Sequence, residues 1–172
     1  MKNTIGLMLL ATLLLNPSFV QARNNFRALG ESVRHELNML PYYTVFDHLS
    51  YRVEGQKVVL SGKVSRPVLK SDAENVVKRI PGVKAVENRI EVLPLSGFDD
   101  RIRLAELRAV YGNGNLSRYA LTPAPPIRII VDRGHVTLEG AVASQMDRTI
   151  AGIAANTVPG VFSVRNNLVV GG

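Results

Sequence analysis

The sequence predicts two tandem α+β units, each with the order helix, strand, strand, helix, strand and each forming a three-stranded mixed sheet with two helices on one face. The main observation is an internal repeat, because residues 58–92 align without a gap on residues 136–170. Apolar residues also alternate over short runs, as in strands with one buried face, and recur at helical spacing before each Pro-Gly pair. The identical pairs of the repeat are Val58/Val136, Leu60/Leu138, Gly62/Gly140, Val64/Val142, Ala73/Ala151, Pro81/Pro159, Gly82/Gly160, Val83/Val161, Val86/Val164, Asn88/Asn166 and Val92/Val170.

The first unit is expected at residues 23–95 and begins with a helix that ends at Pro41. A hairpin of two alternating strands follows, with its turn at Gly55-Gln56. Ser65 is expected to cap the second helix, and Pro67 fits its first turn. The closing strand runs parallel to the strand before that helix, because such crossovers are right-handed. The apolar faces of the two helices consist of Phe26, Leu29, Val33, Leu37 and Leu40, and of Leu69, Ala73, Val76, Val77 and Ile80.

The second unit is expected at residues 96–172 and repeats this order. Ser96 with Asp99, and Ser144 with Asp147, have capping-box spacing at the starts of its two helices. Its expected helices are 98–111 and 144–158, and its expected strands are 127–132, 135–142 and 162–170.

The repeat also predicts which strand positions face the core. Val58, Leu60, Val64, Val86 and Val92 should be buried, as should their partners in the second unit. The remaining repeated residues are interpreted as structural: Gly62, Gly82, Asn88, Gly140, Gly160 and Asn166. The mid-strand glycines indicate a close helix crossing or a bulge. The two asparagines face inward and need hydrogen-bond partners, for which the Pro-Gly-Val turn is the expected site.

The two units differ in the connector between first helix and first strand. In the second unit it spans 112–126, and loops of this length are often functional. In the first unit it spans only 41–48. Two interpretations of their large side chains stay open: they cover the core, or they contact a partner or lipid. These side chains are Tyr42, Tyr43, Phe46, Leu116, Tyr119 and Leu121.

Residues 1–22 have the features of a secretory signal peptide, with Lys2 before an apolar run and cleavage expected ahead of Arg23. No later stretch is apolar enough to cross a membrane. The chain has no cysteine, so neither a disulfide nor the acylation site of a bacterial lipoprotein is expected. These features predict a soluble periplasmic product. The net charge of +7 is dispersed, which favours weak attraction to anionic surfaces over nucleic-acid binding.

Residues that could carry catalysis or bind a metal are not grouped in the sequence. His35, His48 and His135 lack the spacing of zinc ligands. The glycines at 112 and 114 are not followed by the Lys-Ser/Thr of a phosphate-binding loop. Asp99-Asp100 is explained by helix capping. No enzymatic activity, metal or cofactor is therefore expected.

The repeated pattern Val-x-Leu-x-Gly-x-Val, then a helix, then Pro-Gly-Val-x-x-Val-x-Asn and a terminal Val resembles the BON domain, named from bacterial osmotically inducible and nodulation proteins. The pattern occurs twice and covers nearly all of the expected mature chain. The resemblance implies a small α/β sandwich, export to the periplasm or outer envelope, and no catalysis. It also implies binding of phospholipid or envelope proteins, with roles in envelope stress or as a chaperone. Some two-domain relatives are lipoproteins, from which this chain departs.

These observations lead to the hypothesis of a periplasmic adaptor that contacts anionic phospholipid or envelope proteins and serves envelope maintenance or stress. The alternative is a holdase chaperone, which would capture unfolded clients on exposed apolar side chains. Lipid adhesion should weaken at high salt, whereas client capture should not. The oligomeric state stays open. The expected contact residues are Lys78, Arg79, Lys84, Arg89, Leu116, Arg118 and Tyr119.

Overall fold

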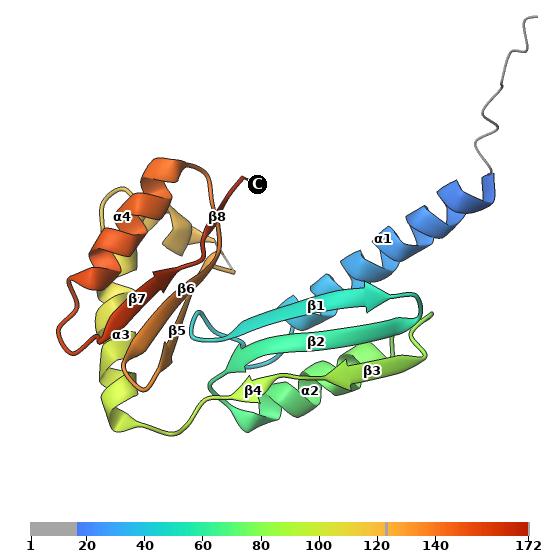
Figure 1. Ribbon diagram of the computed structural model, residues 1–172, viewed down its shortest axis with the longest axis horizontal. Helices are drawn as coiled ribbons and strands as arrows, with labels where there is room; N and C mark the ends of the chain where they lie inside the picture. Colours follow the sequence, from blue (N-terminus) through green and yellow to red (C-terminus); the bar gives the residue numbers. More distant parts are fainter. Residues whose placement is uncertain (1–16, 123, 172) are drawn as a thin grey trace, which may run out of the picture.

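The computed structural model describes residues 17–122 and 124–171, with side chains from Arg27 onward, so most of the expected signal peptide lies outside the described residues. The first unit consists of α1 (Pro17–Asn38), β1 (His48–Glu54), β2 (Lys57–Val64), α2 (Pro67–Lys78), β3 (Ala85–Asn88) and β4 (Glu91–Val92) (Figure 1). The second unit consists of α3 (Gly97–Tyr111), the short 3-10 helix η1 (Ser117–Leu121), β5 (Ile127–Asp132), β6 (His135–Val142), α4 (Gln145–Asn156), β7 (Ser163–Asn166) and β8 (Val169–Val170).

The predicted two-unit α+β fold is confirmed. In each unit the hairpin is antiparallel and the chain after the second helix pairs in parallel with the central strand, β2 or β6. The two helices of each unit pack together and on the sheet. Leu60 and Leu138 are fully buried, which supports the predicted register, because a shift of one residue would turn them outward.

The closing strand of each unit is broken in two, which the alternating pattern did not predict. The Asn88 side-chain oxygen accepts from the backbone N–H of Ile90, and Asn166 does the same for Leu168. These two-residue turns rotate the chain, so that Ile90 and Leu168 enter the core. Val92 is consequently 38% exposed and Val170 47% exposed. The prediction that these two valines are buried is wrong.

Each of the two asparagines also ties the closing strand to the helix that precedes it. The Asn88 side-chain nitrogen donates to the Lys70 carbonyl at 2.8 Å, and that of Asn166 donates to the Arg148 carbonyl at 2.7 Å. The expected structural role is therefore present, but the bonding partner is the helix and not the Pro-Gly-Val turn.

The mid-strand glycines are required by a neighbouring strand, not by a helix. Gly62 and Gly140 have φ of +120° and +111°. A Cβ at Gly62 would collide with the carbonyl oxygen of His48, and a Cβ at Gly140 with that of Pro126. The expected helix crossing at these positions is wrong.

The connector of the first unit joins the two units. The Ile129 N–H of β5 donates to the Val45 carbonyl at 2.7 Å, and Arg128 donates to the Thr44 carbonyl at 3.0 Å. The side chains of Val45 and Phe46 pack against the core of the second unit. The second unit thus completes its core with residues of the first.

The caps of the helices follow the prediction in the second unit and depart from it in the first. The hydroxyls of Ser96 and Ser144 accept from the N–H groups of Asp99 and Asp147, as predicted. Ser65, by contrast, does not cap α2, whose N-cap is Arg66. Its N–H and hydroxyl both donate to the buried carboxylate of Asp47, which holds Ser65 away from the helix end.

Candidate functional site

The basic residues predicted to form a contact in the first unit are partly neutralised by acids. Lys78 forms an ion pair with Glu74, and Arg89 with Glu87. Arg79 and Lys84 are exposed. Lys84 and Arg89 flank β3, so their backbones lie roughly 16 Å apart at about 3.3 Å per strand residue. These four cations therefore form no single dense cluster.

The long loop of the second unit is anchored to the protein. Leu116 is fully buried in the core of this unit, so the expectation that it contacts a partner is wrong. The Tyr119 hydroxyl accepts from the Ala143 N–H at 2.8 Å and donates to the Asp147 carboxylate at 2.9 Å. Arg118 pairs with the same carboxylate at 2.6 Å. The loop covers the core and pins the turn before α4.

This arrangement also accounts for the electrostatics of the loop. Hydrogen bonds to the Asp147 carboxyl hold its pKa below its usual range. The Ser144 hydroxyl contributes most, followed by the Tyr119 hydroxyl and then the Arg118 guanidinium. Because the carboxylate stays ionised, the exposed Arg118 side chain is neutralised by an ion pair within the protein and contributes less to attraction of an external anion.

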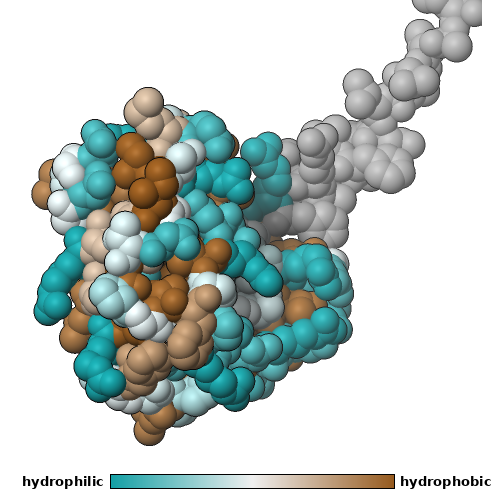
Figure 2. Space-filling model, turned by 60° about the vertical axis from the view of Figure 1, so that its left-hand side comes forward, coloured by the Kyte–Doolittle hydropathy of each residue, from teal (hydrophilic) through white to brown (hydrophobic). Residues whose placement is uncertain are grey.

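Two phenylalanines form an exposed pair at the end of the second unit. The rings of Phe98, at the start of α3, and Phe162, just before β7, have centroids 5.9 Å apart. Phe98 is 38% exposed and Phe162 is 69% exposed. The His135 ring meets Phe162 edge-on, with centroids 5.8 Å apart. Figure 2 brings this unit forward and shows brown apolar atoms exposed between teal polar ones.

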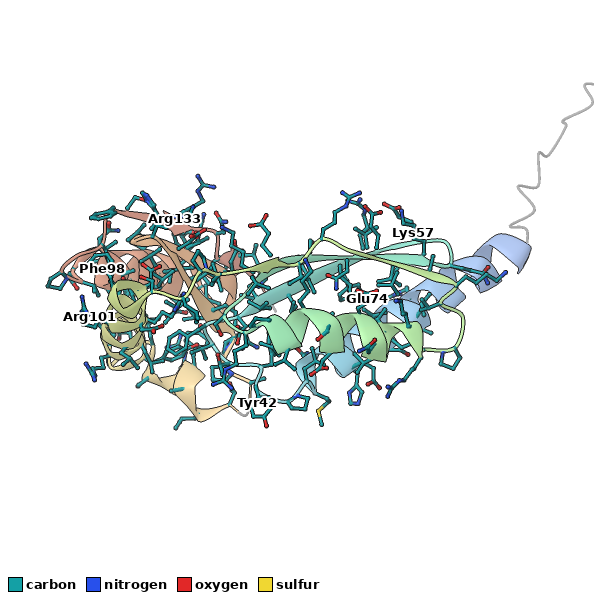
Figure 3. All side chains as sticks on the ribbon, turned by 90° about the horizontal axis from the view of Figure 1, so that it is seen from below. Tyr42, Lys57, Glu74, Phe98, Arg101 and Arg133 are labelled. Atoms are coloured by element: carbon teal, nitrogen blue, oxygen red, sulfur yellow. The ribbon has the colours of Figure 1, made fainter. Side chains whose placement is uncertain are left out.

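Arginines surround this aromatic pair. The Arg101 guanidinium lies over the Phe98 ring, 5.9 Å from its centroid, and Arg133 stands exposed in the turn between β5 and β6. Figure 3 places Phe98 and Arg101 at the end of the second unit that is remote from the first, with Arg133 nearer the middle of that unit. We call Phe98, Arg101, Arg133 and Phe162 the aromatic–arginine patch.

Two glycines make room for the rings. A Cβ at Gly134, whose φ is +78°, would lie 2.7 Å from the Phe162 ring and 3.2 Å from the Phe98 ring. A Cβ at Gly160, with φ of +88°, would lie 3.5 Å from the Phe98 ring. Both turns therefore present flat backbone on which the aromatic side chains rest.

One face of α3 extends the patch. Phe98, Arg101, Leu104 and Arg108 follow one another at spacings of three, three and four residues, so they lie on one side of the helix. Leu104 is 48% exposed, and the two arginines are exposed. The face thus alternates apolar and cationic side chains.

The sequence interpretation missed these residues, although the repeat held a usable signal. The Phe162 N–H donates to the Gly134 carbonyl at 2.8 Å, and the Lys84 N–H donates to the Gln56 carbonyl at the same distance. Phe162 therefore occupies the place of Lys84 in the first unit. An aromatic residue at a position that is polar and exposed in the other copy marks a specialised surface.

Within residues 17–122 and 124–171 there is no helix long and apolar enough to span a membrane. Nor does this part of the chain contain a group of three or more His, Cys, Asp or Glu residues able to hold a metal ion.

Comparison with known proteins agrees with the fold. The BON domain matches residues 29–94 and 113–172, one copy in each unit. The chain belongs to the BON domain family. Proteins with this domain are typically periplasmic or membrane-associated, are generally not enzymes, and are associated with phospholipid interaction. No protein of curated function matches the chain.

Solved structures give a more distant likeness. One is described as CdsD, the structural protein of the Type III secretion system of Chlamydia trachomatis, C-terminal domain; it is 14% identical, with a TM-score of 0.29, over 83% of this chain and 96% of that one. A second structure of CdsD is also 14% identical, with a TM-score of 0.30, over 83% of this chain and 92% of that one. At these values the likeness does not bear on function.

Proposed function

We propose that this BON-family protein is a non-enzymatic adaptor of the bacterial envelope that docks on anionic phospholipid surfaces through the aromatic–arginine patch. The observation that carries the proposal is the exposed Phe98–Phe162 pair with Arg101 and Arg133 beside it. An apolar tip flanked by cations suits the boundary between lipid headgroups and acyl chains.

The expected energies match a reversible membrane contact. Full burial of a phenylalanine side chain contributes about 1.5–3 kcal/mol, and Phe162 leaves most of its ring available. Each arginine near an anionic surface adds about 1 kcal/mol. Two rings and two to three arginines therefore support weak, salt-sensitive adhesion.

The proposal includes the location and processing inferred from the sequence. Residues 1–22 direct export, cleavage before Arg23 releases a periplasmic chain, and residues 23–95 and 96–172 form its two domains. N-terminal sequencing of protein released by osmotic shock tests this step. A full-length chain that stays in the membrane pellet after salt and carbonate washes would contradict it.

Co-sedimentation with liposomes tests the docking surface. Wild-type protein should bind vesicles that contain phosphatidylglycerol, bind neutral vesicles weakly, and dissociate as salt rises. Phe162→Lys installs the residue that the first unit carries at this place. It raises the net positive charge, so purely electrostatic adhesion would strengthen. If the ring inserts, binding should instead fall about tenfold.

The matched control is Ile153→Ser, which removes an exposed apolar side chain from α4 of the same unit. It should leave vesicle binding within about twofold, because α4 lies outside the patch. Equal loss in both variants, or binding by Phe162→Lys at the wild-type level, would overturn the proposal. Binding that survives high salt and requires unfolded protein clients would favour the holdase instead.

A further inference from the structure

The helix-free face of the second sheet carries a groove with a different composition from the aromatic–arginine patch. The groove has a volume of about 400 Å³ and is lined by residues of β5, β6 and β7 together with Lys63 from the end of β2. This volume is within the usual range of small-molecule sites. Because Lys63 belongs to the first unit, both units contribute to the groove.

The floor and walls of the groove combine hydroxyl groups with cations. Thr137 and Arg165 are paired across β6 and β7, as are His135 and Ser163. The His135 ring nitrogen Nδ1 and the Ser163 hydroxyl lie 2.8 Å apart. Neither Arg165 nor Arg133 has an ion-pair partner among the residues that the structure describes.

One carboxylate, that of Asp132, lines the groove; one of its oxygens is paired, and the other is buried without a hydrogen-bond partner among the described residues. Asp132 pairs with Lys63 at 2.7 Å, and this contact holds the pKa of the Asp132 carboxyl below its usual range. Glu91 approaches the same ammonium group at 3.7 Å. The groove thus holds two guanidinium groups that have no ion-pair partner among the described residues, beside the hydroxyl groups of Thr137 and Ser163, and this combination suits a phosphate oxygen cluster.

The first unit provides an internal comparison at every one of these positions. The register of the two sheets equates Arg165 with Glu87, and Thr137 with Val59. In the same way Ser163 corresponds to Ala85, and the 78-residue offset equates Arg133 with Gly55. The corresponding face of the first unit is closed by its own ion pairs, since Glu87 binds both Lys57 and Arg89. The anion-binding side chains are therefore a specialisation of the second unit.

We propose that this groove binds a small phosphate-bearing ligand of about the size of glycerol phosphate, with Arg165 and Arg133 contacting the phosphate and Lys63 approaching from the first unit. Both a soluble phosphate ester and a phospholipid headgroup carry such a phosphate group. The groove shares Arg133 with the docking surface proposed above, whereas Arg165, Thr137 and Ser163 belong to the groove alone.

Titration of the full mature chain with glycerol 3-phosphate, followed by amide resonances in NMR spectra, tests the proposal. The expected result is one saturable site with Kd of roughly 1 mM or tighter, and with the largest shifts at Thr137, Ser163 and Arg165. Arg165→Glu, which installs the residue of the first unit, should abolish binding. Arg165→Gln should weaken it about tenfold. Arg79→Gln, the matched loss of one exposed cation in the first unit, should change it less than twofold.

The same titration with phosphatidylglycerol vesicles separates the two sources. Binding to glycerol 3-phosphate that depends on Arg165 supports a soluble ligand, and Arg165-dependent binding to vesicles alone supports a headgroup. Phe162→Ser should leave glycerol 3-phosphate binding unchanged even if it abolishes vesicle docking, so the two proposals fail separately. Shifts that do not saturate, or equal weakening by Arg165→Gln and Arg79→Gln, would show only diffuse ion attraction and overturn the site. Unchanged binding in Lys63→Gln would remove the first unit from it.

Discussion

The two units share a backbone and differ in the side chains placed on it. Lys84 and Phe162 occupy equivalent positions just before the closing strand, and the N–H of each donates to the equivalent backbone carbonyl. One unit presents an ammonium group there and the other an aromatic ring. Duplication preserved the bonds that build the fold, and the exposed positions between them were free to diverge.

The two units hold the turn between central strand and second helix with different side chains. The turn between central strand and second helix is held in the first unit by Asp47, whose carboxylate accepts from Ser65 and Thr44. In the second unit the Tyr119 hydroxyl bonds the turn at Ala143 and the carboxylate of Asp147. Both anchors come from the connector before the first strand, so connectors of very different length serve the same purpose.

The largest effect is expected where the second connector enters the core. Leu116→Ala should destabilise the protein by about 2–5 kcal/mol, because Leu116 is fully buried and its removal leaves a cavity. Leu121→Ala is the matched control on the same connector, since Leu121 is 86% exposed, and it should cost less than about 0.5 kcal/mol. Chemical denaturation measures both. Equal, small effects would mean that this loop is a surface element.

A slightly smaller loss of stability is expected at the mid-strand glycine that the two units share. Gly62→Ala and Gly140→Ala should each destabilise by about 2–3 kcal/mol, because both positions have positive φ and a Cβ would meet the carbonyl of the paired strand. Gly82→Ala shares a positive φ but has open space around its Cβ, so it should cost only about 1 kcal/mol. Thermal melts of the three variants decide. If Gly82→Ala costs as much as the others, the close strand approach is not the cause.

The core of the second unit differs from that of the first in one buried acid, Glu106 on α3. The buried side chains that the structure describes on α1, the equivalent helix of the first unit, are all apolar. Glu106 is fully buried, and neither carboxylate oxygen has a hydrogen-bond partner among the described residues. Burial raises its pKa from about 4.5 to about 8. The native state therefore holds a proton that the unfolded chain releases above pH 4.5, so stability should fall as pH rises from about 4.5 to 8 and then level off.

Glu106→Gln should remove this contribution to the pH dependence, and Glu106→Leu should stabilise the protein by about 1–3 kcal/mol at pH 8. Denaturation at pH 5, 6.5 and 8 measures both effects. Glu91→Gln, at an exposed acid, serves as control. A wild-type stability that rises over this range, with no difference from Glu106→Gln, would show that the carboxylate is ionised in the native state.

The smallest effect on stability is expected when an exposed residue of the first unit is replaced by its counterpart from the second. Lys84→Phe should change the free energy of unfolding by less than about 0.5 kcal/mol, because Lys84 is exposed and the backbone at this position already accommodates phenylalanine in the second unit. Vesicle binding of this variant should increase only slightly, since Gln56 replaces Gly134 and no second ring lies beside it. An increase equal to the contribution of Phe162 would show that a single exposed ring is sufficient.

The candidate site was poorly predictable from sequence for a physical reason. Phe98 begins a helix and Phe162 precedes a strand, and their 5.9 Å contact exists only because two turns bring these elements together. The basic residues were visible, but their pairing with Glu74 and Glu87 depends on helix and strand geometry. Charge is a property of composition, whereas uncompensated charge is a property of the fold.

The sequence by itself determined the number of units, the order and approximate limits of their elements, the core face of β2 and β6, and the serine caps of α3 and α4. These features depend on local periodicity and on residues close together in the chain. Only the tertiary structure decided that the closing strands break after Asn88 and Asn166, that Ser65 bonds Asp47 instead of α2, and that Leu116 enters the core. Each of these outcomes depends on side chains and backbone groups brought together by folding, whose competition for hydrogen bonds and buried volume is not encoded in any single segment.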